Sequence, residues 1–459
     1  MSDQTAVLTR AAEHARRYLA GVADRPVRAT ATAAELRKAL GADTPLPQTG
    51  EPAEAVIDRL ASAAATGTVA TQGPRFFGFV VGGSLPVANA ADWLVSAWDQ
   101  NAGVYVLSPF VSVVEDAAAS WVRDLASLPP SWSVGFVTGC QMASFTALAA
   151  ARQHLLANAG WDVGARGLFG APPIDVVVSD ESHYTIFNAL RLLGLGADRV
   201  RRIPTDGQGR MRPDALADAL KNGTGPCIVC AQSGNVNTGA FDPLDQIADA
   251  TTARGAWLHV DGAFGFWASA VPARRHLVAG IQRADSIATD AHKWLNVPYD
   301  CGIVLTAHST SHRRAMTQSA AYIIESATER NPHEFVPEES RRGRAVTVYA
   351  ALRALGRDGL ADLVDRNCRQ ATRMADRLRA DARITILNDV VLNQVLVRVS
   401  NDDAVTSEVI SRVQADGTCW LGGTTWHGMG AMRISISNWS TTDNDIDRAA
   451  AAIIASLPK

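Results

Sequence analysis

The stretch TDAHKWLN, Thr289–Asn296, decides how this chain folds and what it can bind. It lies downstream of the apolar segment WLHVDGAFGFW, Trp257–Trp267, in which Asp261 closes a run typical of a buried strand. An aspartate at the end of one strand and a His-Lys pair after the next suit a cofactor whose ring nitrogen needs an anion and whose aldehyde needs an amine. Pyridoxal 5′-phosphate is such a cofactor.

Each of these residue types has a chemical reason in such a site. A buried carboxylate such as Asp261 would keep the pyridine nitrogen protonated, as an electron sink requires. Lys293 would carry the aldehyde as a Schiff base, which substrate amines displace readily, and His292 would lie on the phosphate side. An aspartate at a strand end also serves as a cap or turn residue, so the argument depends on the surrounding motifs.

Two upstream motifs supply further parts of such a site. In SDESHYTIFNALRLLGLG, Ser179–Gly196, a polar turn leads into an amphipathic helix, and His183 at its start can lie flat on a pyridine ring. In VGFVTGCQMASFTALAAAR, Val134–Arg152, a strand and a small-residue turn precede an alanine-rich helix. The free N–H groups at the start of that helix form an anion site suited to a phosphate.

A third motif is SGNVNTGAFDPLDQIAD at Ser233–Asp249. It contains the end of a strand, a polar loop and then a helix, whose start is indicated by the Asp-Pro pair. Asn235, Asn237 and Thr238 could face the cofactor, or they could satisfy the turn.

The ordered set SDESHY, NTGAFDP, HVDGAFG and DAHKWLN resembles the group II pyridoxal-phosphate-dependent decarboxylases, the family of aromatic amino acid, histidine and glutamate decarboxylases. The resemblance runs from about Arg75 and extends through Ser340–Asn367 to Ala431–Asp447. It implies a fold-type I α/β enzyme, similar to aspartate aminotransferase, with a mainly parallel seven-stranded sheet in a large domain and a smaller α+β C-terminal domain.

The resemblance also implies roles for individual residues. Lys293 would be the Schiff-base lysine, Asp261 the pyridinium partner, His183 the ring-stacking base and Ala263 the residue under the ring. The other residues expected to bind the cofactor are Gly139, Cys140, Gln141, Asp290, His292 and Asn235. The family's phosphate turn reads Gly-Gly-Ser-Glu-Ala-Asn or Gly-Ser-Ala-Ser-Glu-Ala, whereas this chain has Gly-Cys-Gln-Met-Ala-Ser at 139–144. A serine hydroxyl is therefore lost at Gln141.

A second departure concerns the reaction. In the family a mobile loop carries a tyrosine that protonates the carbanion left by loss of carbon dioxide, but the matching stretch Ser326–Glu339, SATERNPHEFVPEE, has none. Pro332 falls near the expected place, Tyr322 comes too early, and His333 is a candidate donor that can exchange protons near neutral pH. Alternatively the loop is a solvated connector and His183 gives the proton. An unprotonated carbanion can react with oxygen or transaminate.

The resemblance further implies a homodimer with shared active sites. The segment WDQNAGVY, Trp98–Tyr105, matches a region that lines the substrate pocket, so Trp98, Asn101 and Tyr105 are candidate substrate-binding residues. The alternative is that the two aromatic residues are interface core. Arg433 could bind a substrate carboxylate or form a structural ion pair.

Composition bounds the class of protein. The chain has 459 residues, 47% hydrophobic and 19% charged, which is enough for a large core and more than one domain. A net charge of −3 argues against nucleic-acid or membrane-surface partners, and no membrane helix or signal peptide stands out, so we expect a cytoplasmic protein. Six scattered cysteines predict free thiols. We expect no metal, although Cys227 and Cys230 form a Cys-x-x-Cys pattern.

Alternating periodicity predicts three parts. Residues 1–74 form an alanine-rich helical segment, residues 75–344 a large cofactor-binding α/β domain, and residues 345–459 a small C-terminal domain. The family resemblance implies that the first segment wraps the dimer partner. Ligands of such sheets collect beyond the carboxyl ends of the strands. We therefore expect an enzyme that decarboxylates an L-amino acid to an amine. The alternatives are oxidative deamination to a carbonyl compound, carbon–carbon cleavage, transamination or a catalytically silent binding protein. The sequence does not name the amino acid.

Overall fold

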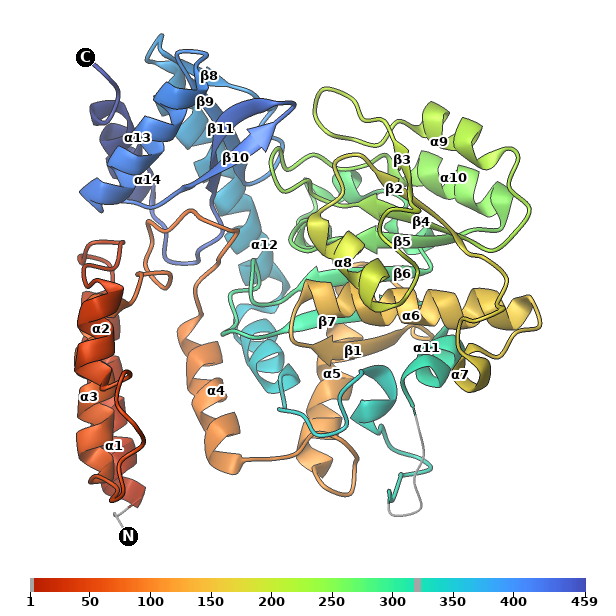
Figure 1. Cartoon of the computed structure of the whole chain (residues 1–459), viewed down its shortest axis with the longest axis horizontal. Helices are drawn as coiled ribbons and strands as arrows, with labels where there is room; N and C mark the ends of the chain where they lie inside the picture. The colour runs from red at the N-terminus through yellow and green to blue at the C-terminus, as the bar shows by residue number, and fades with distance from the viewer. Residues whose placement is uncertain (1–3, 318–322) are drawn as a thin grey trace.

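The computed structural model describes residues 4–317 and 323–459. Its centre is a seven-stranded sheet with the strand order β1-β7-β6-β5-β4-β2-β3 (Figure 1). Strand β7 runs antiparallel to β1 and β6, and the other neighbours are parallel. The expected mainly parallel seven-stranded sheet is confirmed. The strands are β1 Ser133–Val137, β2 Asp175–Ser179, β3 Arg201–Ile203, β4 Cys227–Gln232, β5 Trp257–Asp261, β6 Ser286–Asp290 and β7 Gly302–Thr306.

Helices cover both faces of this sheet, which is why its central strands are nearly continuous apolar runs. Every residue of β4, β5 and β6 is buried. One face carries α6 Cys140–Asn158, α8 Tyr184–Leu192 and α11 Ser309–Met316, with the short α7 Val163–Arg166 beside α6. The other carries α5 Pro109–Leu125, α9 Pro213–Leu220, α10 Leu244–Arg254 and the first part of α12 Ala345–Arg379.

The two faces separate the Cys-x-x-Cys pair of β4. Cys227 packs in the core under α5, α9 and α10, whereas Cys230 packs in the core under α6 and α8. Side chains three positions apart on a strand point to opposite faces, so these two thiols do not share a site. All six cysteines are buried free thiols.

A second, four-stranded antiparallel sheet follows α12, in the order β10-β11-β9-β8. The helix α12 breaks at Gly356, whose φ of 60° is outside the helical range. The elements are β8 Ile384–Ile386, β9 Gln394–Val399, α13 Asp403–Asp416, β10 Gly422–Trp426, β11 Met429–Ser435 and α14 Asp443–Ala455. This part matches the small α+β unit expected from the sequence.

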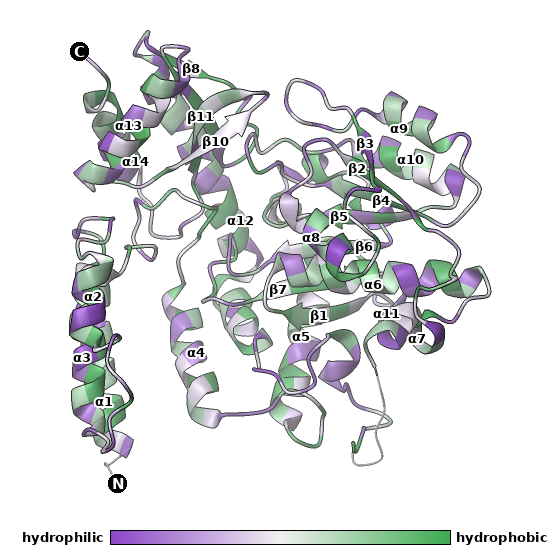
Figure 2. Ribbon diagram, in the orientation of Figure 1, coloured by the Kyte–Doolittle hydropathy of each residue, from purple (hydrophilic) through white to green (hydrophobic). Residues whose placement is uncertain are grey.

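The N-terminal helices lie beside the rest of the molecule as a separate layer (Figure 1). They are α1 Gln4–Gly21, α2 Ala33–Leu40 and α3 Ala53–Gly67, followed by α4 Pro86–Trp98. Arg10 and His14 of α1 both contact Asp58 of α3. Figure 2 shows hydrophilic and hydrophobic residues mixed along α1 and α3. The proline-rich segment at 44–52 lies in the connection between α2 and α3.

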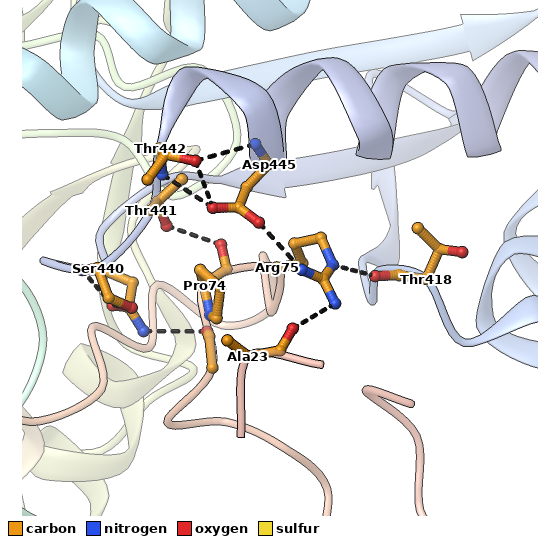
Figure 3. A network of polar contacts seen from close by, with 10 residues as sticks. Ala23, Pro74, Arg75, Thr418, Ser440, Thr441, Thr442 and Asp445 are labelled. Carbon is orange, nitrogen blue, oxygen red and sulfur yellow. Dashed lines mark hydrogen bonds and ion pairs between the residues drawn. The ribbon is translucent and has the colours of Figure 1, made fainter. Parts of the chain in front are cut away.

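Arg75 ties this N-terminal part to the C-terminal sheet (Figure 3). Its guanidinium contacts the Asp445 carboxylate at 2.9 Å and donates to the carbonyls of Thr418 and Ala23 at 2.7 Å. Phe77 continues the link, because its N–H donates to the Trp420 carbonyl. The residues at the proposed boundary at 74/75 therefore contact the C-terminal unit. The division into 1–74, 75–344 and 345–459 stays a proposal.

Four short 3₁₀ helices complete the fold: η1 Gly265–Ala270, η2 Arg275–Val278, η3 Ile281–Arg283 and η4 Pro332–Phe335. In the described ranges no helix is long and apolar enough to cross a bilayer.

Candidate active site

The carboxyl ends of β5 and β6 bring two buried carboxylates and a lysine to one edge of the sheet. Asp261 ends β5 and Asp290 ends the neighbouring parallel strand β6. Lys293 lies in the turn that follows, with its Nζ 2.9 Å from Asp290 Oδ2. Because parallel strands end at the same edge, the two motifs recognised in the sequence form one site.

Asp261 is held in a fixed orientation. Its Oδ1 accepts the N–H of Ala263 at 3.1 Å and the thiol of Cys140 at 3.4 Å, and the residue is only 4% exposed. Within the part of the chain that the structure describes, no hydrogen-bond donor reaches Oδ2. This oxygen is therefore available to a protonated ring nitrogen, which fits the role expected for Asp261.

Helix α6 begins directly beside these carboxylates. Its N-cap, Gly139, has no capping side chain, and the N–H of Cys140 donates to Asp290 Oδ1 at 2.6 Å. The next N–H groups of the first turn, including that of half-buried Gln141, have no acceptor inside a helix. A Cβ on Gly139 would lie 3.2 Å from the His292 ring, so the glycine keeps the turn open. The result is an anion site that fits a phosphate.

His292 borders the same site. Its Nδ1 accepts the N–H of Cys301 at 3.1 Å, and its ring stacks on Tyr299 at 4.3 Å. Burial lowers the pKa of His292, with Asp290 acting in the opposite direction. Because Nδ1 is an acceptor, the neutral ring carries its proton on Nε2, which lies 3.3 Å from Asp290 Oδ1.

His183 approaches the cluster from the start of α8, where it is the N-cap residue. Its Nδ1 lies 2.7 Å from the Thr185 hydroxyl. Burial lowers the pKa of His183, with the nearby charges of Asp261 and Lys293 acting in opposite directions. The ring is therefore neutral at pH 7 and carries one N–H.

The positive charge of Arg433, in β11, also helps to lower the pKa of His183. Burial lowers the pKa of Arg433 itself. Among the described residues no carboxylate pairs with its guanidinium, so the structural ion pair considered from the sequence is absent there.

Lys293 lies partly buried between these groups, with 20% of its side chain exposed. Burial opposes its charge, but Asp290 and its other acidic neighbours outweigh burial and raise the pKa of the amine. Ala263 joins the two carboxylates, because its N–H donates to Asp261 and its carbonyl accepts the N–H of Asp290. The structure thus brings together most of the expected set: Lys293, Asp261, His183, Ala263, Gly139, Cys140, His292 and Asp290.

Asn235 is used inside its own loop. Its side-chain oxygen accepts the N–H groups of Asn237 and Thr238, and its amide donates to Gln232. Asn237 in turn accepts the hydroxyl of Thr424. These contacts favour the turn-forming interpretation over the cofactor-facing one.

The candidate substrate residues lie elsewhere in this chain. Trp98 is 43% exposed and packs edge-on against Phe110. The Asn101 side chain accepts the N–H of Arg341, and the N–H of Tyr105 donates to Asn331. Among the described residues, none of these contacts reaches the lysine cluster. Their role in a pocket stays a prediction that depends on a second chain.

His333 of η4 is 2% exposed, and its contacts are with residues in and around its loop. Its Nδ1 lies 3.0 Å from Glu339 Oε2 and its Nε2 3.5 Å from Glu325 Oε1, while its N–H donates to Gly103. No contact with the lysine cluster occurs in the described ranges, so its role as a proton donor remains a prediction. Tyr322 lies outside the described residues.

Two contacts of the site were not expected from the sequence. Tyr299 stacks on His292, and the Cys140 thiol donates to Asp261. The sequence does show an aromatic residue six positions after the lysine and a cysteine in the phosphate turn. These two residues could have pointed to the contacts. Burial raises the pKa of Cys140, which keeps its thiol protonated as a donor.

A lysine, a buried aspartate and a helix N-terminus at one sheet edge define a site for an aldehyde cofactor that carries a phosphate. Residues 35–400 match the family model described as the pyridoxal-dependent decarboxylase conserved domain, and the chain belongs to that family. The cofactor of the family is pyridoxal 5′-phosphate, and Lys293, Asp261 and the first turn of α6 fit its aldehyde, ring nitrogen and phosphate.

Two curated decarboxylases are similar to this chain in sequence. The chain is 32% identical over 300 residues to an aromatic-L-amino-acid decarboxylase of Bacillus atrophaeus, covering 64% of this chain and 60% of the relative. It is 32% identical over 346 residues to the acidic amino acid decarboxylase GADL1 of Bos taurus, covering 72% of this chain and 64% of the relative. The matches thus span less than two thirds of either relative.

Solved structures show the same fold over nearly the whole chain. Mouse CSAD in apo form superposes with a TM-score of 0.91 at 25% identity and covers 98% of each chain. The 4-hydroxyphenylacetaldehyde synthase of Rhodiola rosea superposes with a TM-score of 0.86 at 22% identity, covering 99% of this chain and 98% of the other. The second likeness concerns the fold alone.

Proposed function

We propose that the protein is a pyridoxal-phosphate-dependent decarboxylase that converts an L-amino acid to an amine and carbon dioxide. One observation carries the proposal: Lys293, Asp261 and the N-terminus of α6 meet at one edge of the sheet, with His183 beside them. Membership of the decarboxylase family supports it.

Each residue of the site has a separate role in the proposed reaction. The bound cofactor supplies an electron sink for the bond between Cα and the carboxylate. Asp261 would hold the proton of the ring nitrogen, and Lys293 would provide the amine that binds the aldehyde. The N–H groups at the start of α6 and His292 would hold the phosphate. His183, which is neutral and carries one N–H, lies near Asp261 and Lys293 and would give a proton to the product carbon.

Arg433 is the proposed anchor for a substrate carboxylate. It is a partly buried cation that no carboxylate in the described ranges neutralises, and it lies within electrostatic reach of His183. An unpaired guanidinium that is partly removed from water is costly, so an anionic substrate group would relieve that cost.

We infer that the protein works as a homodimer. A band of apolar side chains on α4 and α5 is exposed in the single chain, more than isolated surface residues require. Its members are Trp93, Leu94, Trp98, Phe110 and Val113, each 43–58% exposed. The N-terminal layer of α1–α3 stands free to wrap a second copy (Figure 1). Sedimentation should give twice the chain mass, and charged substitutions at Leu94 and Val113 should halve it.

A second outcome of the same chemistry is oxidative deamination to a carbonyl compound. The observation that favours it is the loop at 326–339, which has no tyrosine and whose His333 is paired with Glu339. One solved structure with the same fold is named a 4-hydroxyphenylacetaldehyde synthase, and this supports the alternative. Carbon–carbon cleavage and transamination stay as further alternatives.

The test is to incubate the purified protein and pyridoxal 5′-phosphate with pooled amino acids, with and without oxygen, and to identify products by mass spectrometry. Amine and carbon dioxide in equal amounts support decarboxylation. Borohydride should fix the cofactor to Lys293, and Lys293→Ala should lose this covalent link. A reduced adduct on another lysine would contradict the assignment. The cytoplasmic location expected from the sequence stays a prediction.

A further inference from the structure

We propose that Asp290 weakens cofactor binding, because its carboxylate competes with the cofactor phosphate for the N-terminus of α6 and pairs with the lysine that must bind the aldehyde. The proposal rests on the proposed function, since it concerns the same site.

Asp290 already pairs with both groups that the cofactor needs. Its Oδ1 accepts the N–H of Cys140, the first residue of α6, at 2.6 Å, and its Oδ2 lies 2.9 Å from Lys293 Nζ. The side chain is 3% exposed, so water does not screen these contacts. A carboxylate at a helix N-terminus makes the same interaction that a phosphate makes there.

The backbone keeps this carboxylate in place. The N–H of Asp290 donates to the Ala263 carbonyl at 2.9 Å, and its own carbonyl accepts the indole N–H of Trp267 at 3.0 Å. Asp290 is the last residue of β6, and this strand is hydrogen-bonded to β5 on one side and to β7 on the other. The backbone of Asp290 is therefore fixed, and a phosphate at α6 would lie close to its carboxylate.

The charges around the Asp290 carboxylate determine how strongly it repels a bound phosphate. Lys293 and His292 lie against it, and Cys140 and Tyr299 face it as neutral groups. His183 feels the charges of both Asp290 and Asp261, together with that of Arg433. A phosphate monoester brings about 1.5 to 2 further negative charges. Repulsion between buried like charges is strong because the local dielectric constant is low.

The carboxylate also acts on the lysine. Although burial opposes the charge of Lys293, Asp290 helps to raise the pKa of its amine, and a charged amine does not attack an aldehyde. Removing the carboxylate should thus free both the helix and the amine.

The experiment compares full-length wild type, Asp290→Asn and Asp290→Ser after removal of bound cofactor. Dissociation constants are measured by absorbance for pyridoxal 5′-phosphate and for pyridoxal, which lacks the phosphate, and inorganic phosphate is titrated as a competitor. Asp300→Asn is the matched control, since Asp300 is also near His292 but is 43% exposed and pairs with Arg344. Circular dichroism confirms that each variant is folded.

We expect both Asp290 variants to bind pyridoxal 5′-phosphate and inorganic phosphate about tenfold more tightly or better, with a smaller gain for pyridoxal. The control should match wild type. Weaker binding of pyridoxal 5′-phosphate by the variants would overturn the proposal. An equal gain for pyridoxal would also overturn it, because Asp290 would then act through the lysine alone. Wild type that takes up no cofactor at all would instead refute the proposed function on which the inference rests.

Discussion

The guanidinium of Arg341 lies 2.6 Å from the carboxylate of Glu115, and both side chains are fully buried. Arg341 also donates to the carbonyls of Ala102 and Phe136. The same carboxylate lies 3.3 Å from Arg330. Glu115 thus joins α5 to β1, to the segment at 98–105 and to the loop before α12, which together form the candidate substrate region.

Glu115→Ala should therefore be strongly destabilising, because it leaves the Arg341 charge buried without its carboxylate. We expect a loss of about 3–5 kcal/mol in the free energy of unfolding, measured by urea unfolding with tryptophan fluorescence. Asp116→Ala is the control: the neighbouring carboxylate is 65% exposed and 3.9 Å from Arg330, and should contribute less than about 1 kcal/mol. Equal losses in the two variants would contradict the role of Glu115.

Asp261→Asn should leave the protein folded but lower turnover by orders of magnitude, because a neutral amide does not hold a proton on the ring nitrogen. Turnover is measured with the cofactor content of each preparation. Asp175→Asn is the control, since Asp175 lies at the opposite, amino end of β2 and is half exposed. Near-normal turnover in Asp261→Asn would refute the assignment.

His312 predicts a loss of stability in acid. Burial lowers its pKa to about 4, while its ring contacts the Ser133 hydroxyl at 2.8 Å and the Phe335 carbonyl at 3.0 Å. In the unfolded chain His312 takes up a proton near pH 6.5, whereas in the folded chain it stays neutral down to about pH 4. Stability therefore falls as the pH drops from about 6.5 to about 4, by up to about 3 kcal/mol from this residue. Buried His259, whose pKa burial also lowers to about 4, acts in the same direction.

The check is urea unfolding at pH 7 and pH 5. His312→Asn should be less stable than wild type at pH 7 but should lose less on acidification, whereas His276→Asn, on the exposed surface, should keep the wild-type dependence. An unchanged dependence in His312→Asn would show that the ring titrates normally in the folded protein.

The loop at 326–339 predicts partial diversion of the reaction to a carbonyl compound, ammonia or peroxide, since it has no tyrosine to protonate the product carbon. Wild type, His333→Ala and Pro332→Tyr are compared for amine and carbonyl yields under air and under nitrogen. Pro332→Tyr should raise the share of amine. Clean amine and carbon dioxide from all three, without oxygen uptake, would assign the proton to another group, with His183 the next candidate.

Strong local patterns predicted much of the fold. The short apolar runs that end in Asp261 and Asp290 were predicted as strands, and all five residues of each strand are buried. The sequence did not reveal β10, whose segment GGTTW is only partly buried and has little apolar character. The direction of β7 was equally hidden, because strand orientation depends on the neighbours and not on composition.

The site was predictable where one residue type has one chemical use, as with Lys293 and Asp261. It was not predictable where tertiary contacts decide between uses. Asn235 turns inward to its own loop, and the contact between Cys140 and Asp290 joins residues 150 positions apart. The sequence could name both residues but not their pairing.

The place of β1 at the edge of the sheet governs the order in which the protein can fold. Ser133–Val137 pairs with Gly302–Thr306, so this strand has no partner in the sheet until more than 160 further residues have been synthesised. The helix that offers the phosphate site follows β1 directly, and it cannot dock in its final position before that pairing forms. Contacts of such long sequence separation make folding slow. A chain stalled short of β7 would leave an apolar strand and half of its active site exposed on the ribosome, and so open to aggregation.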